Sequence, residues 1–418
     1  MIHMQQSFDK KNLFVDKAVF IVGDVGSINK MTQIHADEPF SERRILFLDC
    51  VSKALLHDKE ARKYPDVITF AFWIRKAHME LERAKYCNFH RCETIKVIGQ
   101  GTVFHVAPSN VAVNFAYSFV VSFITGNNSI VRIPSKDFRQ VDIICGAINT
   151  VKESFPDLKD TICLVRYERN EMINDFLSGF CDVRVIWGGD NTINDIRASK
   201  LPVRSYDITF SDRYSLALID SEYYLRLSAR DRNCVGDIAQ KFYNDTYLTD
   251  QNACTSPRLV VWTGKDEKIR KASRVFWDAL SHLVDEQYAF QEIQGIDKLS
   301  NFLLAACEID GIDINDNRNN LYRVQLSKLV PQIMEYRGDS GFFYEYSLTD
   351  PKELTEFISR KVQTLTYIAE REVVERYTKD CVAVGLDRIV PVGQSMDFDF
   401  IWDGYNLIDR MTRNVSII

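Results

Sequence analysis

The sequence lacks a long uninterrupted apolar segment. A membrane-spanning helix needs roughly 18 or more consecutive apolar residues. The most apolar region, Val111 to Thr125, is interrupted by Asn114 and by serines. The first twenty residues also lack the continuous apolar core of a secretion signal. Together these absences predict a soluble, cytoplasmic protein without a membrane span.

An excess of basic residues is also missing. The chain carries 52 Lys and Arg against 58 Asp and Glu, a net charge of −6. Nucleic-acid binding relies on positive charge to neutralise phosphates, so no nucleic-acid partner is predicted. With 46% hydrophobic and 26% charged residues over 418 positions, the composition is typical of a globular protein with two or three substructures.

The ten cysteines include no C-x-x-C pair. Cys87 and Cys92 are the closest two, but no second pair or histidine cluster accompanies them, so no metal site is predicted. A free cysteine is most often a small buried hydrophobe. A cysteine with another role must therefore be recognised from its neighbours.

Between residues 103 and 210 the pattern alternates between short apolar strands and helices. Strands are predicted at 103–107, 129–133, 161–167, 182–187 and 206–210, and helices at 111–124, 137–154, 170–180 and 191–199. Such alternation indicates a parallel sheet with helices on both faces. Ligands of these sheets bind at the carboxyl ends of the strands.

A second α/β region follows, and three segments are predicted. Residues 1–210 form amino-terminal helices and a Rossmann-like cofactor domain, and residues 211–394 form a second α/β domain. Residues 395–418 are rich in large apolar side chains and are interpreted as an oligomerisation arm or as an arm packed within the chain.

Polar residues follow two of the predicted strands. Asn110 follows the strand "VFHVA", where its side chain can donate to an oxygen above the sheet; taken alone, it is better interpreted as a helix cap. Arg132, Ser135 and Lys136 lie in "VRIPSK" and suit ribose hydroxyls or a phosphate, although Ser135 also suits a helix cap. His105 lies between apolar residues and is interpreted as a hydrogen-bonded core residue.

Two glycines, Gly188 and Gly189, follow the strand "VIW" and precede a helix. Backbone N–H groups at such a place can approach a pyrophosphate, but paired glycines are also common in ordinary turns. No G-x-G-x-x-G follows any predicted strand, so the usual dinucleotide fingerprint is absent.

Cys254, in "TDQNACTSPR", lies on a predicted connector between a helix and a strand. Its small neighbours Ala253, Thr255 and Ser256 leave room for a substrate at the sulfur, and its backbone N–H can stabilise an oxyanion. A thiol nucleophile reacts as the thiolate, so a lowered pKa is expected here. No histidine lies nearby in sequence, which argues against a Cys/His protease.

Taken in order, several segments resemble the aldehyde dehydrogenase superfamily, and within it the LuxC-type acyl-CoA reductases of bacterial fatty acid reductase systems. The resemblance covers roughly Gly99 to Arg413 and includes "GTVFHVAPSNVAVNFAYS", "GNNSIVRIPSK", "VIWGGD", "QNACTSPR", "FFYEY", "KVQTLTY", "DRIVPVG" and "IWDGYNLI".

The resemblance implies Cys254 as the acyl-accepting nucleophile and Asn110 as an oxyanion donor. It implies a cofactor site at Arg132, Ser135 and Lys136, with Gly188 and Gly189 over the pyrophosphate. Many NAD-dependent members have a glutamate where this chain has Lys136, and a lysine attracts a 2′-phosphate, so NADPH is the expected cofactor.

The chain departs from hydrolytic aldehyde dehydrogenases in "DITFSDRYS", which lacks their water-activating glutamate. The expected reaction is therefore reduction of an acyl thioester, taken from CoA or from a partner synthetase, to an aldehyde. Two alternatives stay open. One is a CoA-acylating aldehyde dehydrogenase working oxidatively, and the other is a degenerate member that binds nucleotide or partner without turnover. A homo-oligomer is also expected.

Overall fold

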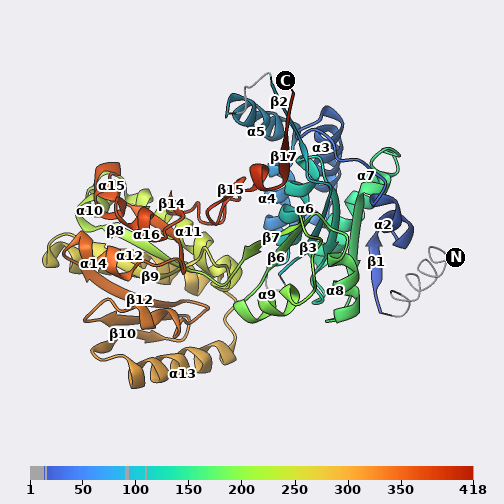
Figure 1. Ribbon diagram of the computed structural model, residues 1–418. Coiled ribbons are helices and arrows are strands. Elements are labelled where there is room, and N and C mark those ends of the chain that lie inside the picture. Colours follow the sequence, from blue (N-terminus) through green and yellow to red (C-terminus); the bar gives the residue numbers. More distant parts are fainter. Residues whose placement is uncertain (1–13, 15–16, 90–93, 109–110, 418) are drawn as a thin grey trace. The chain divides into compact units, whose positions relative to one another are not determined.

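The protein is described by a computed structural model that covers residues 14, 17–89, 94–108 and 111–417 (Figure 1). The chain forms two compact units, divided between Ser211 and Asp212, and residues 405–418 return to the first unit. Residues 395–404 belong to the second unit, so the predicted carboxyl-terminal segment is shared between the two. Of the helices in the described ranges, none is long and apolar enough to cross a membrane.

The first unit is an α/β unit whose elements follow the predicted alternation. In chain order they are β1 (Val19–Val22), α2 (Val25–Met31), α3 (Glu42–His57), η1 (Ala61–Lys63), α4 (Pro65–Trp73), α5 (Lys76–Phe89), β2 (Ile95–Gly99), β3 (Thr102–Val106), α6 (Asn114–Ile124), β4 (Asn128–Arg132), α7 (Arg139–Lys152), η2 (Lys159–Thr161), β5 (Ile162–Arg166), α8 (Glu171–Ser178), β6 (Val183–Trp187), α9 (Asp190–Arg197), β7 (Tyr206–Phe210), β16 (Tyr405–Asn406), α17 (Leu407–Arg410) and β17 (Thr412–Ser416).

Its main sheet has the strand order β1-β5-β4-β3-β6-β7. Strands β3 to β7 are parallel, and β1 pairs antiparallel with β5 at the edge. The chain runs outward from β3 through β4 to β5 and then crosses back to β6 and β7, which places a topological switch point beside β3. This reversal is visible in Figure 1, where β3 lies near β6 and β7.

Helices cover both faces of this sheet. Apolar side chains of α2, α8 and α9 pack on one face, where Ile28, Leu177 and Ile193 join Phe104 and Cys163 in one buried cluster. On the other face, the α6 hydroxyls of Ser118 and Ser122 bond to His105 of β3. Burying apolar side chains on both faces stabilises the sheet, at roughly 1.5–3 kcal/mol for each large side chain.

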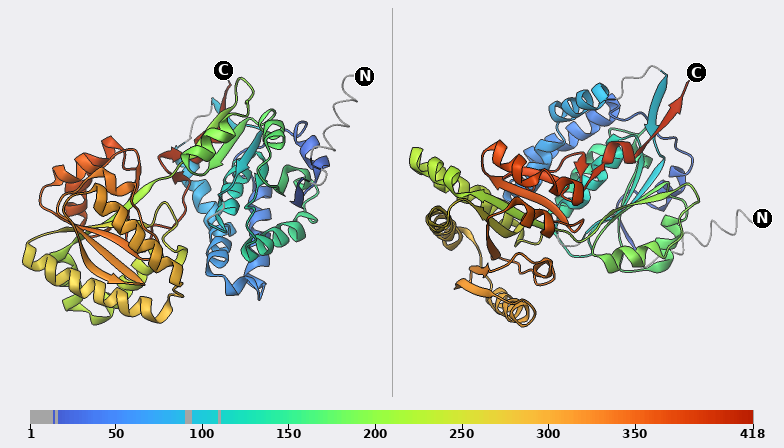
Figure 2. Two further views of the ribbon diagram at one scale, coloured as in Figure 1. Left: turned by 90° about the horizontal axis from the view of Figure 1, so that it is seen from below. Right: turned by 60° about the vertical axis from the view of Figure 1, so that its left-hand side comes forward.

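The second unit is built on a seven-stranded sheet of order β10-β11-β12-β9-β8-β13-β14 (Figure 2). All neighbours are parallel except β10 and β11. Its elements are β8 (Tyr214–Asp220), α10 (Ser221–Arg230), α11 (Arg232–Thr246), η3 (Tyr247–Thr249), β9 (Pro257–Thr263), α12 (Asp266–Gln287), α13 (Glu292–Glu308), β10 (Ile312–Arg318), β11 (Leu321–Leu326), η4 (Pro331–Met334), β12 (Phe342–Leu348), α14 (Pro351–Phe357), β13 (Val362–Ile368), α15 (Arg371–Thr378), α16 (Cys381–Val384), β14 (Arg388–Pro391) and β15 (Ile401–Trp402).

Two apolar clusters sandwich this second sheet. Helices α10, α11 and α12 pack on one face around Phe242, Phe276 and Trp277. Helices α13 and α14 pack on the other face through Ala305 and Leu354. The central strands β8 and β9 are buried from end to end apart from Asp220, as expected for strands covered on both faces. The loops at their ends are therefore held by a rigid core.

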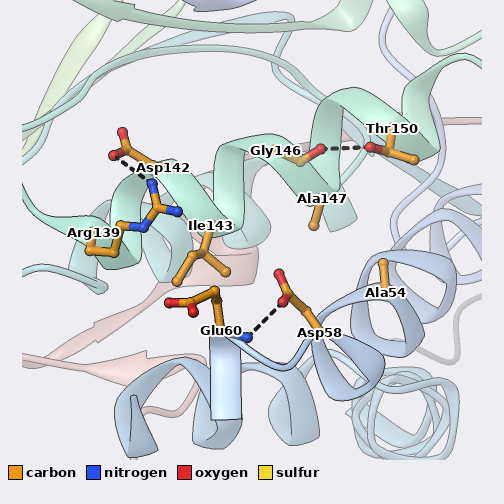
Figure 3. A pocket seen from close by; sticks show the side chains of 9 residues that line it. All are labelled: Ala54, Asp58, Glu60, Arg139, Asp142, Ile143, Gly146, Ala147 and Thr150. Carbon is orange, nitrogen blue, oxygen red and sulfur yellow. Dashed lines mark hydrogen bonds and ion pairs between the residues drawn. The ribbon is translucent and has the colours of Figure 1, made fainter. Parts of the chain in front are cut away.

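A pocket of about 360 Å³ lies in the first unit between α3 and α7 (Figure 3). Its lining includes four charged residues, Asp58, Glu60, Arg139 and Asp142. None of the predicted site residues is among the residues that line it. This pocket therefore gives no support to the predicted site.

Candidate active site

Cys254 lies on a tight connector, as the sequence predicts. Helix α11 ends at Thr246 and strand β9 begins at Pro257, with η3 and Cys254 between them. The chain reverses through Asp250 and Gln251, whose φ angles of 50° and 60° lie in the left-handed region that few side chains adopt. Such strained residues often occur at functional sites.

Cys254 is a central residue of a β-turn. The backbone N–H of Ser256 donates to the carbonyl of Ala253 over 3.1 Å, which makes Cys254 and Thr255 the two middle residues. Ala253, Thr255 and Ser256 are buried, whereas Cys254 is partly exposed. The turn therefore holds Cys254 on a rigid base and leaves the residue partly accessible.

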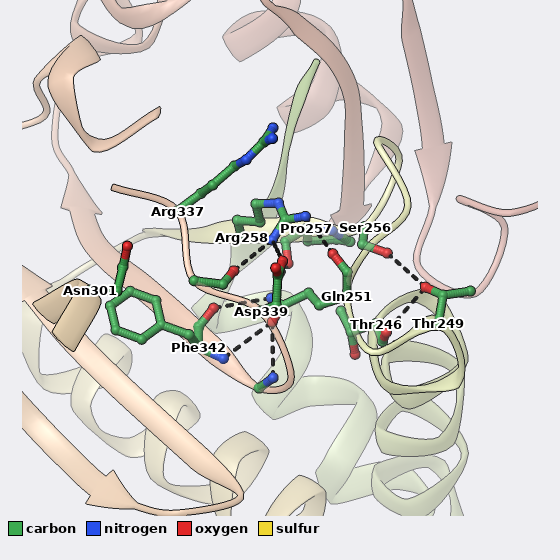
Figure 4. Close-up of polar contacts among 12 residues, drawn as sticks. Thr246, Thr249, Gln251, Ser256, Pro257, Arg258, Asn301, Arg337, Asp339 and Phe342 are labelled. Carbon is green, nitrogen blue, oxygen red and sulfur yellow. Dashed lines mark hydrogen bonds and ion pairs between the residues drawn. The ribbon is translucent and has the colours of Figure 1, made fainter. Parts of the chain in front are cut away.

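The side chain of Gln251 ties this connector to strand β12 (Figure 4). Its amide nitrogen donates to the carbonyls of Pro257 (2.8 Å) and Phe342 (3.1 Å), and its amide oxygen accepts from the N–H groups of Gly341 (3.0 Å) and Phe342 (3.2 Å). These four bonds use the full capacity of an amide side chain, which is completely buried here. Gln251 thus fixes the path of the chain into Cys254.

Arg258 holds the connector from the other end. Its buried guanidinium donates to the carbonyl of Gln251, to the carbonyl of Gly338 over 2.6 Å, and to the carboxylate of Asp339. A charged side chain that is 4% exposed needs such partners, because an unpaired buried charge is costly. Gln251 and Arg258 together join the Cys254 turn to the loop before β12.

The pKa of the Cys254 thiol is raised, contrary to the expectation from sequence. Burial of the sulfur is the largest cause, and the nearby carboxylates of Asp212 and Asp403 add to it. The backbone N–H of Arg213 and the guanidinium of Arg258 lower this pKa but do not offset burial. The predicted lowered pKa is therefore wrong, because desolvation disfavours the thiolate more than these groups favour it.

Salt bridges surround this edge of the second unit. Asp212 pairs with Arg337, and Arg213 pairs with Asp387 and with Asp403, the latter over 2.8 Å. These residues precede or flank the amino ends of the parallel strands, as Cys254 does at β9. Asp212 is one of the two carboxylates in the stretch "DITFSDRYS", and its ion pair leaves it poorly placed to activate water.

The second carboxylate of that stretch, Asp207, is also engaged. It pairs with the buried Arg184 over 2.7 Å and with Arg197 over 3.3 Å. The guanidinium of Arg184 also donates to the carbonyls of Ile196 and Ser199. Asp207 is therefore a structural partner in the first unit.

The predicted cofactor residues gather at one edge of the first unit. Arg132 ends β4 and is followed by Ser135 and Lys136, and the two glycines follow β6. Strands β4 and β6 are the two neighbours of β3, so these residues lie at the carboxyl ends beside the switch point. The arrangement suits a nucleotide.

Two basic side chains at this edge remain accessible. The Arg132 guanidinium stacks over the Tyr167 ring at 4.7 Å and donates to the Tyr167 carbonyl over 3.3 Å. Lys136 is exposed, with its ammonium 5.1 Å from the Phe138 ring and with no carboxylate partner among the described residues. Lys136 is thus available to an anionic group.

The two glycines differ. Gly188 donates its N–H to the carbonyl of Phe210 over 3.1 Å, which commits this group to the sheet edge and removes it from pyrophosphate binding. Gly189 is exposed, and a Cβ placed on it would contact no described atom within 4 Å. Only Gly189 therefore leaves room for the close approach of a ligand.

The helix-capping alternative for Ser135 is wrong, because α7 begins at Arg139 with Phe138 as its cap. Helix α6 begins at Asn114, and Val113 stands at its cap position. Asn110 itself lies outside the described residues, and its role as an oxyanion donor stays a prediction.

His105 is the core residue that the sequence predicts. Its ring is completely buried, and its two nitrogens lie 2.8 Å from the hydroxyls of Ser118 and Ser122. Burial lowers the pKa of His105 to about 3, so the ring is neutral. Ser118 also accepts from the indole N–H of Trp187 over 3.0 Å, which links this core network to the end of β6.

Comparison with known proteins identifies the family. The profile of the family described as Acyl-CoA reductase (LuxC) matches residues 25–287, well over half of the chain and all of the predicted site residues. The chain belongs to the LuxC family. The resemblance seen in the sequence is therefore confirmed.

Two relatives of this LuxC chain are both named long-chain acyl-protein thioester reductase. The protein from Photobacterium phosphoreum is 22% identical over 77% of this chain and 64% of its own length. The protein from Vibrio harveyi is 20% identical over 77% of this chain and 65% of its own length. The chain thus spans less than two thirds of the length of either relative.

Solved structures establish the fold. An aldehyde dehydrogenase from Physcomitrella patens, solved in complex with the reaction product succinate, matches with a TM-score of 0.65. The match covers 93% of this chain and 88% of that chain at 11% identity. The predicted aldehyde dehydrogenase-like α/β fold with two units is confirmed.

Proposed function

We propose that this LuxC chain reduces an acyl thioester to an aldehyde, with NADPH as reductant and Cys254 as the covalent acyl carrier. The observation that carries the proposal is the placement of Cys254 in a tight turn between small residues, which suits attack on a carbonyl. The names of the two relatives support a long-chain acyl group delivered on a protein, and the family description supports delivery on CoA.

The first step transfers the acyl group to the protein. The sulfur of Cys254 attacks the thioester carbonyl, and the proton that it loses passes to the departing donor sulfur. A carbon–sulfur bond to Cys254 forms, and the bond to the donor sulfur breaks, which releases the donor as a thiol. The negative charge that develops on the carbonyl oxygen is stabilised by the N–H of Cys254 and, in this proposal, by the amide of Asn110.

The second step releases the product. NADPH, when bound, supplies a hydride to the acyl carbon. The bond between this carbon and the Cys254 sulfur then breaks, so that an aldehyde leaves, and the sulfur takes up a proton from water, which restores the thiol. The ion pairs of Asp207 and Asp212 support this course over hydrolysis, since neither carboxylate is free to activate water.

The residues at the carboxyl edge of the first unit fit such a cofactor. Lys136 is exposed without a carboxylate partner among the described residues, and Gly189 leaves open space above the start of α9. We assign Lys136 to the 2′-phosphate, Arg132 and Ser135 to the ribose, and Gly189 to the pyrophosphate. Gly188 is left out because its N–H is committed to Phe210.

Mass spectrometry after addition of long-chain acyl-CoA tests the covalent step. We expect an acyl adduct on the peptide that contains Cys254, and no such adduct in Cys254→Ala. The matched control is Cys307→Ala, because Cys307 is an exposed free cysteine of the same unit. An adduct that persists unchanged in Cys254→Ala would show that another group carries the acyl chain.

The acyl group and its donor are tested by rate measurements. We expect aldehyde formation with NADPH to increase with acyl chain length, and acyl groups supplied by a partner synthetase to be accepted as well. Equal or higher rates with short acyl donors would contradict a fatty acyl substrate.

A further inference from the structure

The hydroxyl of Ser215 joins the nucleophile turn to the sheet of the second unit. Ser215 is completely buried near the start of β8, 39 residues before Cys254. Its Oγ donates to the carbonyl of Cys254 over 2.6 Å and accepts from the backbone N–H of Thr364 in β13 over 3.3 Å. A single hydroxyl thus connects three segments of the chain.

The strand pairing around Ser215 is irregular on both sides. The register of β8 with β9 shifts between Ser215 and Leu216, and the register of β13 with β8 shifts between Val362 and Leu365. Pro257, which lies opposite Ser215, has no N–H to donate. The hydroxyl accepts from the Thr364 N–H within this irregular stretch, and such irregularities often redirect chains near active sites.

The bond from Ser215 acts on the part of the turn that is free to reorient. In a β-turn, the peptide between the two middle residues takes different orientations in different turn types. In this turn that peptide joins Cys254 to Thr255, and its carbonyl is the group that Ser215 holds. The hydrogen bond that holds this carbonyl therefore also holds the Cys254 backbone, from which the thiol side chain extends.

A second contact from the start of β8 reaches the same residue. The backbone N–H of Arg213, two residues before Ser215, lies against the Cys254 thiol and favours its ionised form. Four charged groups also act on this thiol: Asp212, Asp403, Arg258 and Arg337. Two residues at the amino end of β8, Arg213 just before the strand and Ser215 within it, therefore contact Cys254 at its sulfur and at its carbonyl.

We propose that Ser215 is a positioning residue for Cys254. Its hydroxyl locks the central peptide of the turn and so holds the thiol against the Arg213 N–H. Ser215 does not itself touch the reacting atoms. The role in catalysis rests on the proposed function, whereas the role in holding the thiol does not.

Alkylation of Cys254 by iodoacetamide as a function of pH measures this role without substrate or cofactor. The extent of reaction is read by mass spectrometry on the Cys254 peptide, which separates it from the exposed Cys87 and Cys307. In Ser215→Ala, we expect the midpoint of the pH curve to move upward by about 0.5–1 unit, the equivalent of one lost hydrogen bond. A midpoint equal to that of the unaltered protein would overturn the proposal.

Ser221→Ala is the matched control. Ser221 is equally buried at the other end of β8, and its hydroxyl has no hydrogen-bond partner in the described structure. This variant should leave the alkylation curve unchanged. A shift in Ser221→Ala as large as that in Ser215→Ala would mean that any lost buried hydroxyl has this effect, and the proposal would fail.

A pair of variants of equal shape covers the case in which alanine prevents folding. Thr and Val have nearly the same shape, but Thr carries a hydroxyl where Val carries a methyl group. Ser215→Thr should retain the midpoint of the unaltered protein, and Ser215→Val should show the upward shift. Indistinguishable curves for the two variants would contradict the role of the hydroxyl.

Steady-state kinetics tests the role of Ser215 in catalysis, which rests on the proposed function. In Ser215→Ala, we expect kcat for acyl reduction to fall by about 10- to 100-fold, with KM nearly unchanged, because misplaced reacting groups slow the chemical step. If the unaltered protein reduces no acyl thioester but the alkylation shift is present, the proposed function fails and the positioning role stands.

Discussion

Cys254 is distinguished from the other cysteines by its place in the chain more than by its ionisation. Burial raises its pKa, and it also raises that of the core residue Cys145, to about 12. Both side chains are therefore thiols at pH 7. Oxidation and alkylation consume the thiolate, so a protonated resting thiol is protected. The two residues differ in exposure. Cys254 lies in a turn and is partly exposed, whereas Cys145 lies in α7 and is buried.

Lys136 gives a direct test of cofactor choice. In Lys136→Glu, we expect kcat/KM for NADPH to fall by about 5- to 30-fold, because a carboxylate would repel the 2′-phosphate that the proposed function assigns to the lysine. The value for NADH should change by less than about threefold, since that cofactor lacks the phosphate. Steady-state rates of aldehyde formation with each cofactor measure both numbers.

Lys200→Glu is the control for this charge reversal. Lys200 is exposed in the same unit, and the change in net charge is identical. It should leave the preference for NADPH intact. Equal losses with NADPH and NADH in Lys136→Glu would show that Lys136 does not read the 2′-phosphate.

The sequence predicts Cys254 because small polar residues there interrupt an otherwise apolar pattern. It gives no comparable signal for Ser215, whose bond to Cys254 spans 39 residues and arises only when β8 and β9 pair. The direction of the Cys254 pKa is missed for the same reason, since desolvation depends on groups brought in by folding. At Gly188 the local sequence pattern marks the glycine as a candidate site residue. It does not show that the N–H of this glycine donates to Phe210 in the folded chain.

At the level of elements, the two units present their candidate residues at opposite kinds of strand end. In the first unit they follow β4 and β6, at carboxyl ends, and in the second unit Cys254 precedes β9, at an amino end. The rule that ligands bind at the carboxyl ends of parallel strands covers only the first unit. In the second unit, the position of Cys254 depends on a connector that Gln251 and Arg258 hold rigid.

The segment after β14 is a second element that contacts the Cys254 turn. Asp245 of α11 accepts from the N–H groups of Gly393 (2.6 Å) and Ser395 (3.0 Å) and from the Ser395 hydroxyl (2.8 Å). In the same segment, the sulfur of Met396 accepts from the hydroxyl of Thr255 over 3.2 Å. Asp245 thus anchors a segment that rests on the residue next to Cys254.

This anchor predicts a pH dependence of stability. Burial raises the pKa of Asp245 to about 6, above the value of 3.8 for an exposed Asp. Because the folded state then binds more protons between these two values, stability rises as the pH falls from 6 toward 4. Between pH 7.5 and pH 5 we expect a gain on the order of 1 kcal/mol, or about 3–5 °C in the thermal midpoint, from this group.

Asp245→Asn isolates the contribution of Asp245 from those of other carboxyl groups, such as Asp397, whose pKa burial also raises. Thermal midpoints of both proteins are measured at pH 7.5 and pH 5. The midpoint of the unaltered protein should gain about 3–5 °C relative to the variant on acidification. A constant difference between the two proteins would mean that Asp245 does not titrate in this range.

The alternating pattern of the first unit predicts its parallel strands to within one or two residues, because β3, β4, β5 and β6 are buried along nearly their whole length. Edge elements are harder. Strand β10 is largely exposed and reads "IDINDNR", so it lacks the apolar alternation of a strand. Helix α13 keeps apolar side chains such as Ile296 and Leu304 exposed, which obscures its buried face. Strand β10 and helix α13 both pack on β11, and this packing, which the local sequence pattern does not show, determines their structure.

For the whole molecule, the last fourteen residues matter most because they return to the first unit. Strand β17 pairs antiparallel with β2, and Leu407, Ile408 and Met411 are buried. The amide of Asn127 donates to the Met411 carbonyl over 2.9 Å. An oligomerisation arm in residues 395–418 stays a prediction, and removing this whole segment cannot test it, since the deletion would also open the core of the first unit.

Deletion of residues 405–418 should therefore destabilise the first unit and spare the second. Loss of three buried apolar side chains and the β2–β17 ladder is expected to lower the thermal midpoint of the first unit by more than about 10 °C. Scanning calorimetry should then show two separate transitions, the upper one belonging to the second unit. Ile417→Ala is the control, because this side chain is 56% exposed and its loss should leave the midpoint unchanged. A single transition at the original temperature would mean that the segment adds nothing to the core of the first unit, and a change of mass in solution could then be assigned to subunit contacts alone.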